Sequence, residues 1–273
     1  MKLIFAAVTS LLGAVSRAAA GDYYRNDTSE SQRQVAYGKQ TRHHPKHKIF
    51  KNWAGAVKHG HEIGEVIARM NVPWIPAPND GQGYGMAAWV GIDGTSGCKS
   101  LLQTGIDWYK HKDGTVKYKA WYEWYPESSE DSWVEIHPGD TIEMHVKANS
   151  KTSGSFSIIN RSLGQHHTET FDAPPEGVPK LCRKTAEWII ETATEDYYIS
   201  QVPHSRLAGF PDFGSIQFTS TRLLGRHGWG SAKGADIIDV RPPGMVTLTK
   251  CGTSGIGTVQ CDYVGPVGGA PGH

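Results

Sequence analysis

The sequence lacks the short motifs that identify the commonest hydrolases. It has no Gly-x-Ser-x-Gly element, which argues against an α/β-hydrolase. It has no Asp-Thr-Gly or Asp-Ser-Gly turn, which argues against a pepsin-like aspartic peptidase. The segment His61–Glu65 lacks the second histidine of a zinc peptidase motif, and no Cys-x-x-Cys pair is present. We therefore expect neither a metal nor a cofactor.

Helical periodicity is also scarce, while glycine and proline are plentiful, with 32 and 15 residues. Only Glu62–Arg69 shows a weak helical pattern, and the nearby Gly64 and Pro73 make a strand or loop an equally good interpretation. Short β-rich runs between turn dipeptides favour an all-β fold, either an antiparallel sandwich or a barrel. The expected strands are Met86–Ile92, Leu101–Tyr109, Val116–Tyr125, Thr141–Ala148, Ser155–Asn160, Ala186–Thr192, Ser215–Thr219, Asp236–Val240 and Met245–Lys250.

The N-terminus has the features of a secretory signal over residues 1–20. Lys2 is followed by a short apolar run, Leu3–Val15, and by a small-residue cleavage site at Ala18–Ala20. The run is too short to span a bilayer, and no later segment is long and apolar enough to do so. We expect an exported, extracellular protein without a membrane anchor.

Residues 21–51 differ in charge from the rest of the chain. They hold seven Lys or Arg and three Asp or Glu, whereas residues 52–273 hold 19 basic and 24 acidic residues. One interpretation is a disordered linker. The other is a basic propeptide whose cations pair with acidic groups of the enzyme, a pairing that acid would weaken. A nucleic-acid-binding tail fits an exported chain poorly, so we expect no nucleic-acid partner.

The four cysteines of an exported chain favour two disulfide bonds, for which three pairings are possible. Cys251 and Cys261 flank a glycine-rich turn, which suggests a local hairpin bond and leaves Cys98 to pair with Cys182. Two Asn-x-Ser/Thr sites, at Asn26 and Asn160, are candidate glycosylation acceptors.

Two of the cysteines precede polar residues at the same spacing. Gln103 follows Cys98 by five positions, and Glu187 follows Cys182 by five. If these cysteines are bonded, the carboxamide and the carboxylate come close together. Such a pair suits peptide cleavage, because one group moves protons and the other stabilises an oxyanion.

Strand alternation groups further polar and aromatic side chains on shared faces, because successive residues of a strand point to opposite sides. The groups are Trp121, Glu123 and Tyr125; Trp89, Gly91 and Asp93; and Gln103, Gly105 and Asp107. We interpret these faces as a polar and aromatic groove on a concave sheet, although any single tryptophan also suits an apolar core.

Six segments in series resemble the eqolisins, the fungal glutamic peptidases. They are Asn52–Gly55, Ala88–Gly94, Leu102–Asp107, Ala120–Pro126, Pro138–Ile142 and Ala186–Glu191, and the similarity ends near Phe210–Gly214 and the closing strands. The resemblance implies a domain at about residues 52–264 that is a sandwich of two curved antiparallel sheets. We expect a flexible tail at residues 265–273.

The resemblance also implies a secreted, propeptide-bearing endopeptidase that works in acid and resists pepstatin. The catalytic residues map to Gln103 and Glu187, and the substrate-groove positions to Trp53, Trp89, Asp93, Glu123 and Tyr125. We expect a monomer whose partners are protein or peptide substrates and its own basic propeptide.

The expected mechanism assigns a role to each catalytic residue. Ionised Glu187 activates water, Gln103 donates to the oxyanion, and Glu187 then protonates the leaving nitrogen. Asp107 is a candidate for orienting the Gln103 amide or the water. The alternative is a secreted carbohydrate-binding or glycan-cleaving sandwich. It explains Trp121, Glu123 and Tyr125, but it gives no role to Gln103 or to the basic segment.

Overall fold

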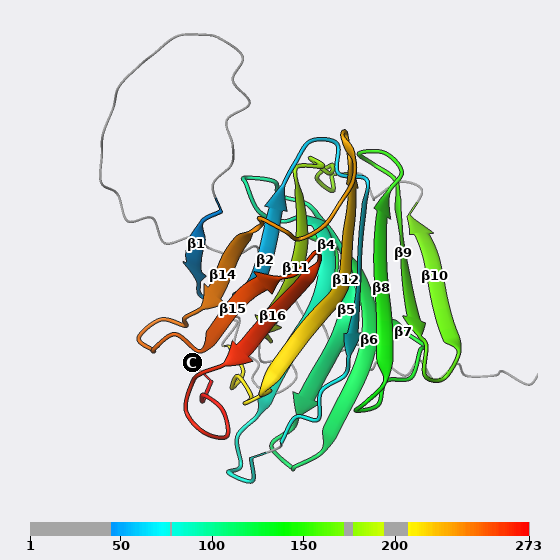
Figure 1. Cartoon of the computed structure of the whole chain (residues 1–273). Coiled ribbons are helices and arrows are strands. Elements are labelled where there is room, and N and C mark those ends of the chain that lie inside the picture. The colour runs from blue at the N-terminus through cyan, green and yellow to red at the C-terminus, as the bar shows by residue number, and fades with distance from the viewer. Residues whose placement is uncertain (1–44, 77, 172–176, 194–206, 273) are drawn as a thin grey trace, which may run out of the picture.

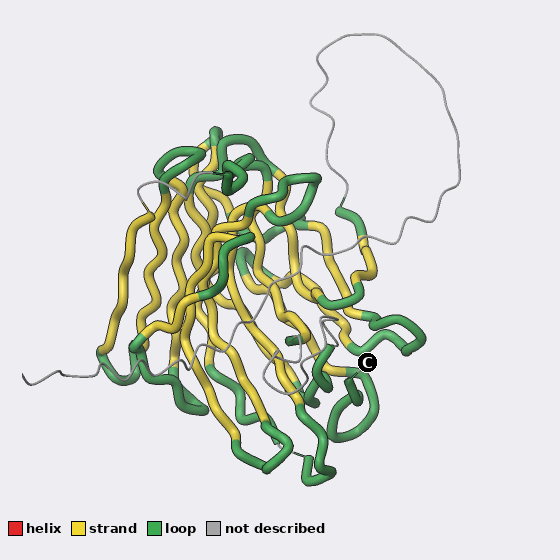
Figure 2. The backbone as a smooth tube through the Cα atoms, turned by 180° about the vertical axis from the view of Figure 1, so that it is seen from behind, coloured by secondary structure: helices red, strands yellow, loops and turns green. Residues whose placement is uncertain are grey.

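Two β-sheets packed face to face make up the part of the chain that the computed structural model describes, residues 45–76, 78–171, 177–193 and 207–272 (Figure 1). The predicted signal sequence, Asn26 and most of the predicted basic segment lie outside these residues. Viewed from behind, the described chain consists only of strands and loops (Figure 2). No helix of the described residues is long and apolar enough to cross a membrane.

Sheet 1 has eight strands. Its spatial order is β1 (His47–Phe50), β14 (Asp236–Val240), β2 (Trp53–His59), β11 (Thr185–Thr192), β4 (Tyr84–Asp93), β5 (Leu101–Lys110), β6 (Val116–Tyr125) and β7 (Glu130–Ser132). Strand β1 pairs with β14 in parallel, and the other neighbours run antiparallel.

Sheet 2 is antiparallel throughout. Its order is β10 (Gln165–Phe171), β9 (Gly154–Asn160), β8 (Thr141–Ala148), β3 (Glu65–Asn71), β12 (Ser215–Gly225), β16 (Thr258–Tyr263) and β15 (Thr249–Ser254), with β13 (Gly228–Gly230) paired to β12. The all-β sandwich expected from the sequence is therefore confirmed.

The alternation pattern located some strands well and missed others. Strands β6, β8 and β14 have the predicted ends, and Glu62–Arg69 contributes to strand β3 rather than to a helix. The predicted strand Met245–Lys250 overlaps only the start of β15. Strand β10 was not predicted, because its sequence Gln-His-His-Thr-Glu-Thr-Phe is polar along an exposed edge and has no apolar alternation.

The two sheets differ in how their outer faces are covered. In sheet 2, strands such as β8 and β9 alternate between buried and partly exposed positions. In sheet 1, every residue of β4 and β11 is buried. The even-numbered residues of β11, such as Trp188, join the core between the sheets, and Ile189 joins a second apolar cluster on the outer face of sheet 1.

Residues near both predicted ends of the domain contact the sandwich. Phe50 is 6% exposed and stacks on Trp53, so the last residues of the predicted pro-segment are built into sheet 1. At the other end, Ala270 is buried and exchanges two backbone hydrogen bonds with Phe210, whereas Val267 is 99% exposed. The domain bounds at residues 52 and 264 stay predictions.

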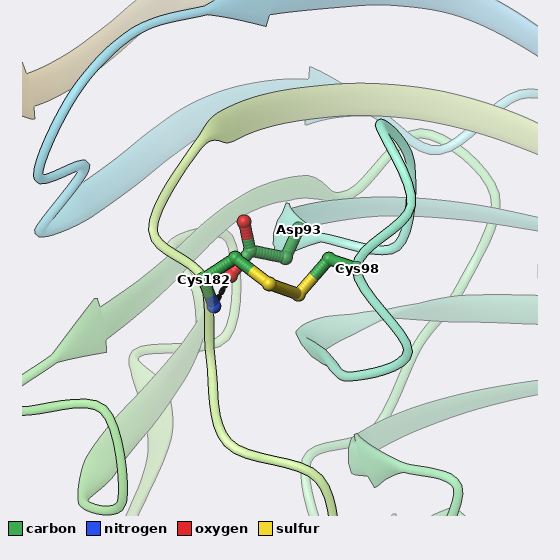
Figure 3. Close-up of side chains that lie close together, drawn as sticks. All are labelled: Asp93, Cys98 and Cys182. Atoms are coloured by element: carbon green, nitrogen blue, oxygen red, sulfur yellow. Dashed lines mark hydrogen bonds between the residues drawn. A yellow bond between two sulfur atoms is a disulfide. The ribbon is translucent and has the colours of Figure 1, made fainter.

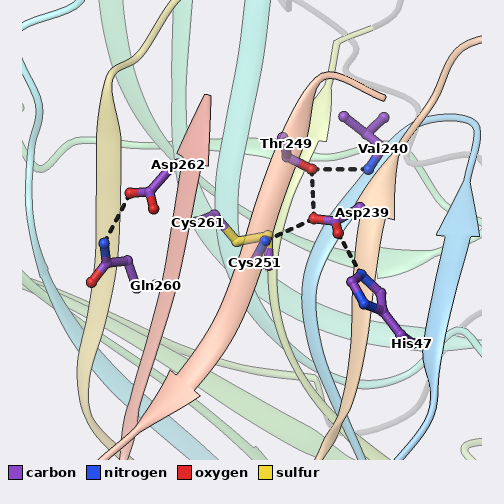
Figure 4. The surroundings of a disulfide bond; sticks show 8 residues. All are labelled: His47, Asp239, Val240, Thr249, Cys251, Gln260, Cys261 and Asp262. Atoms are coloured by element: carbon purple, nitrogen blue, oxygen red, sulfur yellow. Dashed lines mark hydrogen bonds and ion pairs between the residues drawn. A yellow bond between two sulfur atoms is a disulfide. The ribbon is translucent and has the colours of Figure 1, made fainter. Parts of the chain in front are cut away.

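The structure contains the expected disulfide bonds, Cys98–Cys182 and Cys251–Cys261. Cys251 and Cys261 are direct partners across the hairpin of β15 and β16. Next to them the buried Asp239 accepts hydrogen bonds from Thr249 and from the Cys251 amide, and it pairs with His47 of β1 (Figure 4). The Cys251–Cys261 disulfide links β15 to β16, and the Asp239 carboxylate links β14 to β15 and β1.

Asn160 is a poor glycan acceptor in the folded domain. Its side chain is fully buried at the end of β9. Both hydrogens of its amide nitrogen are used, one by the Glu135 carbonyl and one by the Asp140 carboxylate. A glycan on this nitrogen would break at least one of these hydrogen bonds, and it has no path to solvent. The burial of Asn160 therefore argues against a glycan there in the folded domain, and its glycosylation stays a prediction.

Candidate active site

Glu187 and Gln103 lie in one transverse row of sheet 1. Glu187 of β11 pairs with Gly91 of β4, Gly91 pairs with Gln103 of β5, and Gln103 pairs with Glu123 of β6. Directly paired residues point to the same face of a sheet, here the outer one. The Cα atoms of Glu187 and Gln103 are two strand spacings apart, about 10 Å, which leaves their side chains within reach of a common reacting group.

Gly91 keeps the space between these two side chains open. A Cβ atom at this position would lie 2.8 Å from Leu101 Cδ1, 3.0 Å from Trp89 Cζ3 and 3.4 Å from Gln103 Cβ. The strand can pass between the two functional residues because glycine adds no side chain there.

Glu187 is fully buried, and one of its oxygens is held by a hydroxyl group. Thr95 donates to Oε1 at 2.8 Å and lies 3.2 Å from the hydroxyl of Thr185. No hydrogen-bond partner among the described residues reaches Oε2. Burial raises the pKa of Glu187 to about 8, against the opposing effect of the Thr95 hydrogen bond. Oε2 is therefore the oxygen left to meet a water molecule or a substrate, and because Glu187 is 0% exposed, it can do so only when the site opens.

The carboxamide of Gln103 is held by its neighbour in the row. Its Nε2 donates to Glu123 Oε2, whereas its Oε1 has no partner among the described residues. Burial raises the pKa of Glu123 well above the usual range, although the hydrogen bond from Gln103 works in the opposite direction. Glu123 therefore sets the orientation of the amide.

Glu191 is a site residue that the sequence reasoning did not assign. It lies four positions after Glu187 in β11, hence on the same face, and it is buried, with 6% exposed. Asn52 and the Trp89 indole each donate to its carboxylate at 3.0 Å. Burial raises its pKa to about 8. The signal in the sequence was strand alternation, which places both glutamates on one face.

Asp107 lies in the row of Glu191 rather than in that of Gln103. The row runs from Glu191 through Ala87 to Asp107. Four residues along β5 separate the Cα atoms of Asp107 and Gln103 by about 13 Å. The negative charge of Asp107 raises the pKa of both Glu191 and Glu123. The hydrogen bond from the Gln103 amide goes to Glu123, which lies directly opposite Gln103, and a role for Asp107 in orienting the water stays a prediction.

Asp93 has a structural role at the end of β4. Its carboxylate accepts the backbone N–H groups of Cys182, Arg183 and Lys184 at 2.7–2.8 Å. Burial raises its pKa, against the effect of these hydrogen bonds. It lies against the Cys98–Cys182 bond (Figure 3), whose two sulfur atoms are bonded to each other and so offer no thiolate to a metal. Asp93 therefore anchors the loop before β11 instead of lining a groove.

The predicted groove tryptophans form the apolar floor of the site. Trp53 and Trp89 are both 0% exposed and meet edge to face with ring centres 4.9 Å apart. Tyr125 is half-buried and packs at the margin of the same cluster. Both tryptophans belong to the apolar cluster on the outer face of sheet 1, and they are buried instead of lining an open groove.

Glu187 and Gln103 face each other across Gly91 on one sheet of an antiparallel sandwich, which is the arrangement expected from the resemblance to the glutamic peptidases. Comparisons with known proteins agree. The Peptidase A4 family model matches residues 51–263. Aspergillopepsin-2 of Aspergillus niger is 36% identical over 231 residues, which cover 78% of this chain and 77% of that protein. Scytalidopepsin B of Scytalidium lignicola is 38% identical over 218 residues, which cover 79% of each chain.

Solved structures show the same similarity. Scytalido-glutamic peptidase with a transition state analog inhibitor superposes with a TM-score of 0.68 at 38% identity, over 78% of this chain and 98% of that one. The aspergilloglutamic peptidase from Aspergillus niger gives 0.57 at 37% identity, over 66% and 99%. The chain therefore belongs to the Peptidase A4 family, the eqolisins, and it is a hydrolase that cleaves peptide bonds.

Proposed function

We propose that this protein is a secreted, acid-active endopeptidase that cleaves peptide bonds with Glu187 and Gln103 and that pepstatin does not inhibit it. The observation that carries the proposal is the row of Glu187, Gly91 and Gln103 across three neighbouring strands. It gives a buried proton carrier and a buried amide donor a common space, on rigid strands instead of on loops.

In the proposed reaction, the free Oε2 of Glu187 takes a proton from water, and the water oxygen attacks the scissile carbonyl carbon. The Gln103 amide leaves Glu123 and donates to the developing oxyanion. Removal of such a donor commonly costs about 3–4 kcal/mol of transition-state stabilisation. Glu187 then passes its proton to the leaving nitrogen. Thr95 keeps the carboxyl group oriented through Oε1.

The protonation state of Glu187 sets a condition on this reaction. With a pKa of about 8, the fully buried carboxyl group keeps its proton in acid. Glu187 can therefore ionise and act as a base in acid only when the site opens, or when substrate binds, so that water reaches its carboxyl group. A hydrated glutamate has a pKa of about 4.3. Histidine is not an alternative base, because it is protonated in acid.

We also propose that the precursor is processed before Lys46. The Lys46 backbone N–H donates to Asp236 at 2.9 Å, and the Lys46 carbonyl accepts from the Ile237 amide. These contacts and the burial of Phe50 make β1 part of the working domain. N-terminal sequencing of the acid-treated protein tests this boundary: we expect Lys46 or an earlier residue, and a start after Phe50 would contradict it.

The function is tested by incubating the purified, acid-treated protein with a denatured protein substrate and pepstatin. We expect peptide fragments in acid, and we expect the Gln103→Ala protein to yield few. Absence of fragments together with binding or cleavage of a glycan would replace the peptidase proposal with the carbohydrate alternative.

A further inference from the structure

A cavity of about 410 Å³ lies beside Glu187, on the side away from Gln103. Its walls come from β1, β2, β14 and the loop 94–98, and they include Thr95 and Val57. Thr95 holds Glu187, and Val57 is the direct strand partner of Glu187. A peptide whose scissile bond lies between Glu187 and Gln103 therefore has this cavity next to it, as a place for one of its side chains.

The cavity combines apolar walls with a cationic end. Phe50, Val57 and Ile238 supply apolar surface, whereas Lys48 and His59 are its only ionisable lining side chains among the described residues. Side-chain exposure is 23% for Lys48 and 32% for His59, so both remain reachable from the cavity.

One buried carboxylate holds both cationic groups. Lys48 Nζ lies 2.8 Å from Asp236 Oδ2, and His59 Nε2 lies 3.3 Å from the same oxygen. Asp236 is 1% exposed, and it also receives the Lys46 backbone N–H. Asp236 therefore holds the two basic groups side by side at one end of the cavity.

Two further groups lie beside this network. Burial lowers the pKa of Lys58, against the opposing effect of the nearby Asp236 charge, and Lys58 Nζ donates to the carbonyls of Lys233 and Gly234. The Ser96 hydroxyl lies 3.3 Å from His59 Nδ1 and is neutral. The basic side chains that line the cavity among the described residues are thus Lys48 and His59, and Glu187, which does not line it, adds a negative charge nearby only in its ionised form.

We propose that this cavity is a substrate side-chain subsite that accepts a glutamate, or another long side chain with an acidic end, and rejects lysine. This inference rests on the proposed peptidase function and adds the substrate class to it. The apolar walls contact the methylene stem, and Lys48 and His59 attract the carboxylate. A lysine would place a further cation beside two others in a partly desolvated site, which is costly.

The test uses the acid-treated, processed protein and matched peptides that differ at one position, occupied by Glu, Gln, Leu or Lys. The position is varied over two residues on each side of the scissile bond. At one of these positions we expect kcat/KM for the Glu peptide to exceed that for the Lys peptide by about tenfold or more at pH 4.5. Lys48→Met and His59→Gln should each reduce this ratio severalfold, chiefly by improving the Lys peptide.

Control variants separate charge from folding. Lys48→Arg keeps the charge and should keep the ratio, and Lys250→Met removes an exposed lysine of β15 and should change nothing. Leu-peptide turnover and the melting temperature report whether each variant is folded. A Glu/Lys ratio that is near one at every position, or that survives both Lys48→Met and His59→Gln, overturns the subsite while leaving the peptidase intact.

A binding measurement keeps the two proposals apart. In the Glu187→Gln protein, fluorescence anisotropy of the same labelled peptides reports the subsite without turnover. Tighter binding of the Glu peptide than of the Lys peptide, lost in the Lys48→Met double variant, supports the subsite even if the catalytic assignment fails. Equal binding of the two peptides refutes it.

Discussion

Glu143 and Glu187 lie on the outer faces of the two sheets, and their surroundings shift their pKa values in opposite directions. Burial alone would raise the pKa of Glu143, but hydrogen bonds and charges from Arg161 and Arg69 outweigh it and lower the pKa. Glu187 has a hydroxyl group in place of arginines, and burial raises its pKa to about 8. The carboxylate on sheet 2 is a partner in an exposed ion network, whereas that on sheet 1 is a buried acid.

The contrast between Glu143 and Glu187 extends to two other glutamates of sheet 1. Three glutamates with raised pKa values lie on the outer face of sheet 1, Glu123, Glu187 and Glu191. Groups with such perturbed pKa values concentrate at functional sites, because catalysis needs carboxyl groups that can change their protonation state. On sheet 2, Glu143 instead pairs with Arg69 and Arg161.

The largest effect is expected from the amide donor. Gln103→Ala removes the group that stabilises the oxyanion, and kcat should fall by about 10²–10³-fold with the fold retained. Gln217→Ala changes a glutamine of β12 that bonds to Gln260 on the exposed face of sheet 2, and it should leave kcat unchanged. Initial rates on a quenched peptide, with melting curves for both variants, make the comparison. Near-normal turnover by Gln103→Ala would exclude this residue from the mechanism.

The second largest effect is expected at Gly91, which lies between Glu187 and Gln103. Gly91→Ala places a methyl group 3.4 Å from Gln103 Cβ and 2.8 Å from the flexible end of Leu101. The protein should fold, since a Leu side chain can move, but displacement of Gln103 should lower kcat by about ten- to a hundredfold. Gly252→Ala in β15 is the matched control, because no atom lies within 4 Å of its added Cβ. Equal kcat values for the two variants would contradict the role of Gly91.

A third prediction concerns the pH dependence of stability. A carboxyl group whose pKa is raised in the folded state binds more protons there than in the unfolded chain. Its contribution is therefore full in acid, and it is lost as pH rises from about 4.3 through the folded pKa of about 8. The melting temperature should fall by about 5 °C or more between pH 4.5 and 7.5.

Glutamate variants locate the source of this fall. Melting curves are measured in the inactive Gln103→Ala background, which prevents self-digestion. Glu191→Gln should flatten the dependence, because it removes one of the titrating groups. Glu143→Gln should not, because a lowered pKa acts in the opposite sense: its contribution is present above the unfolded pKa and is lost as acid protonates the group. Identical slopes in both variants would argue against buried acids as the cause.

The smallest effect is expected on sheet 2. Glu143→Gln removes a partner of Arg69 and Arg161 that lies in an exposed network. Exposed ion pairs contribute little, so the melting temperature at pH 6 should change by about 2 °C or less and kcat should be unaffected. A large loss of activity would show that the two outer faces are coupled.

Alternation and cysteine spacing predicted much of the fold and the correct face for the site. The ends of β6 and β8 follow from the alternation of their residues, and Gln103 and Glu187 each lie five residues after one cysteine of a real disulfide bond. The first inference depends on local geometry, which a sequence records well, whereas the second depends on a bond between cysteines 84 residues apart.

Other features depend on contacts between distant segments. Asp93 anchors a loop about ninety residues away, and Glu123 meets Gln103 only because β5 and β6 pair in one particular register. The burial of Trp53 and Trp89 depends on how the outer face of sheet 1 is covered, which periodicity does not encode. The same limitation explains why β1 and the segment around Ala270 were predicted outside the folded domain.

The central claim is that Glu187 is the proton carrier of the reaction. Its most direct test is kcat at pH 4.5 for Glu187→Gln beside Glu143→Gln, the same substitution on the other sheet. We expect a loss of about 10³-fold or more for Glu187→Gln, within the range for a general acid–base group, and a rate near that of the unmodified enzyme for Glu143→Gln. Substantial turnover by a folded Glu187→Gln protein would contradict the account.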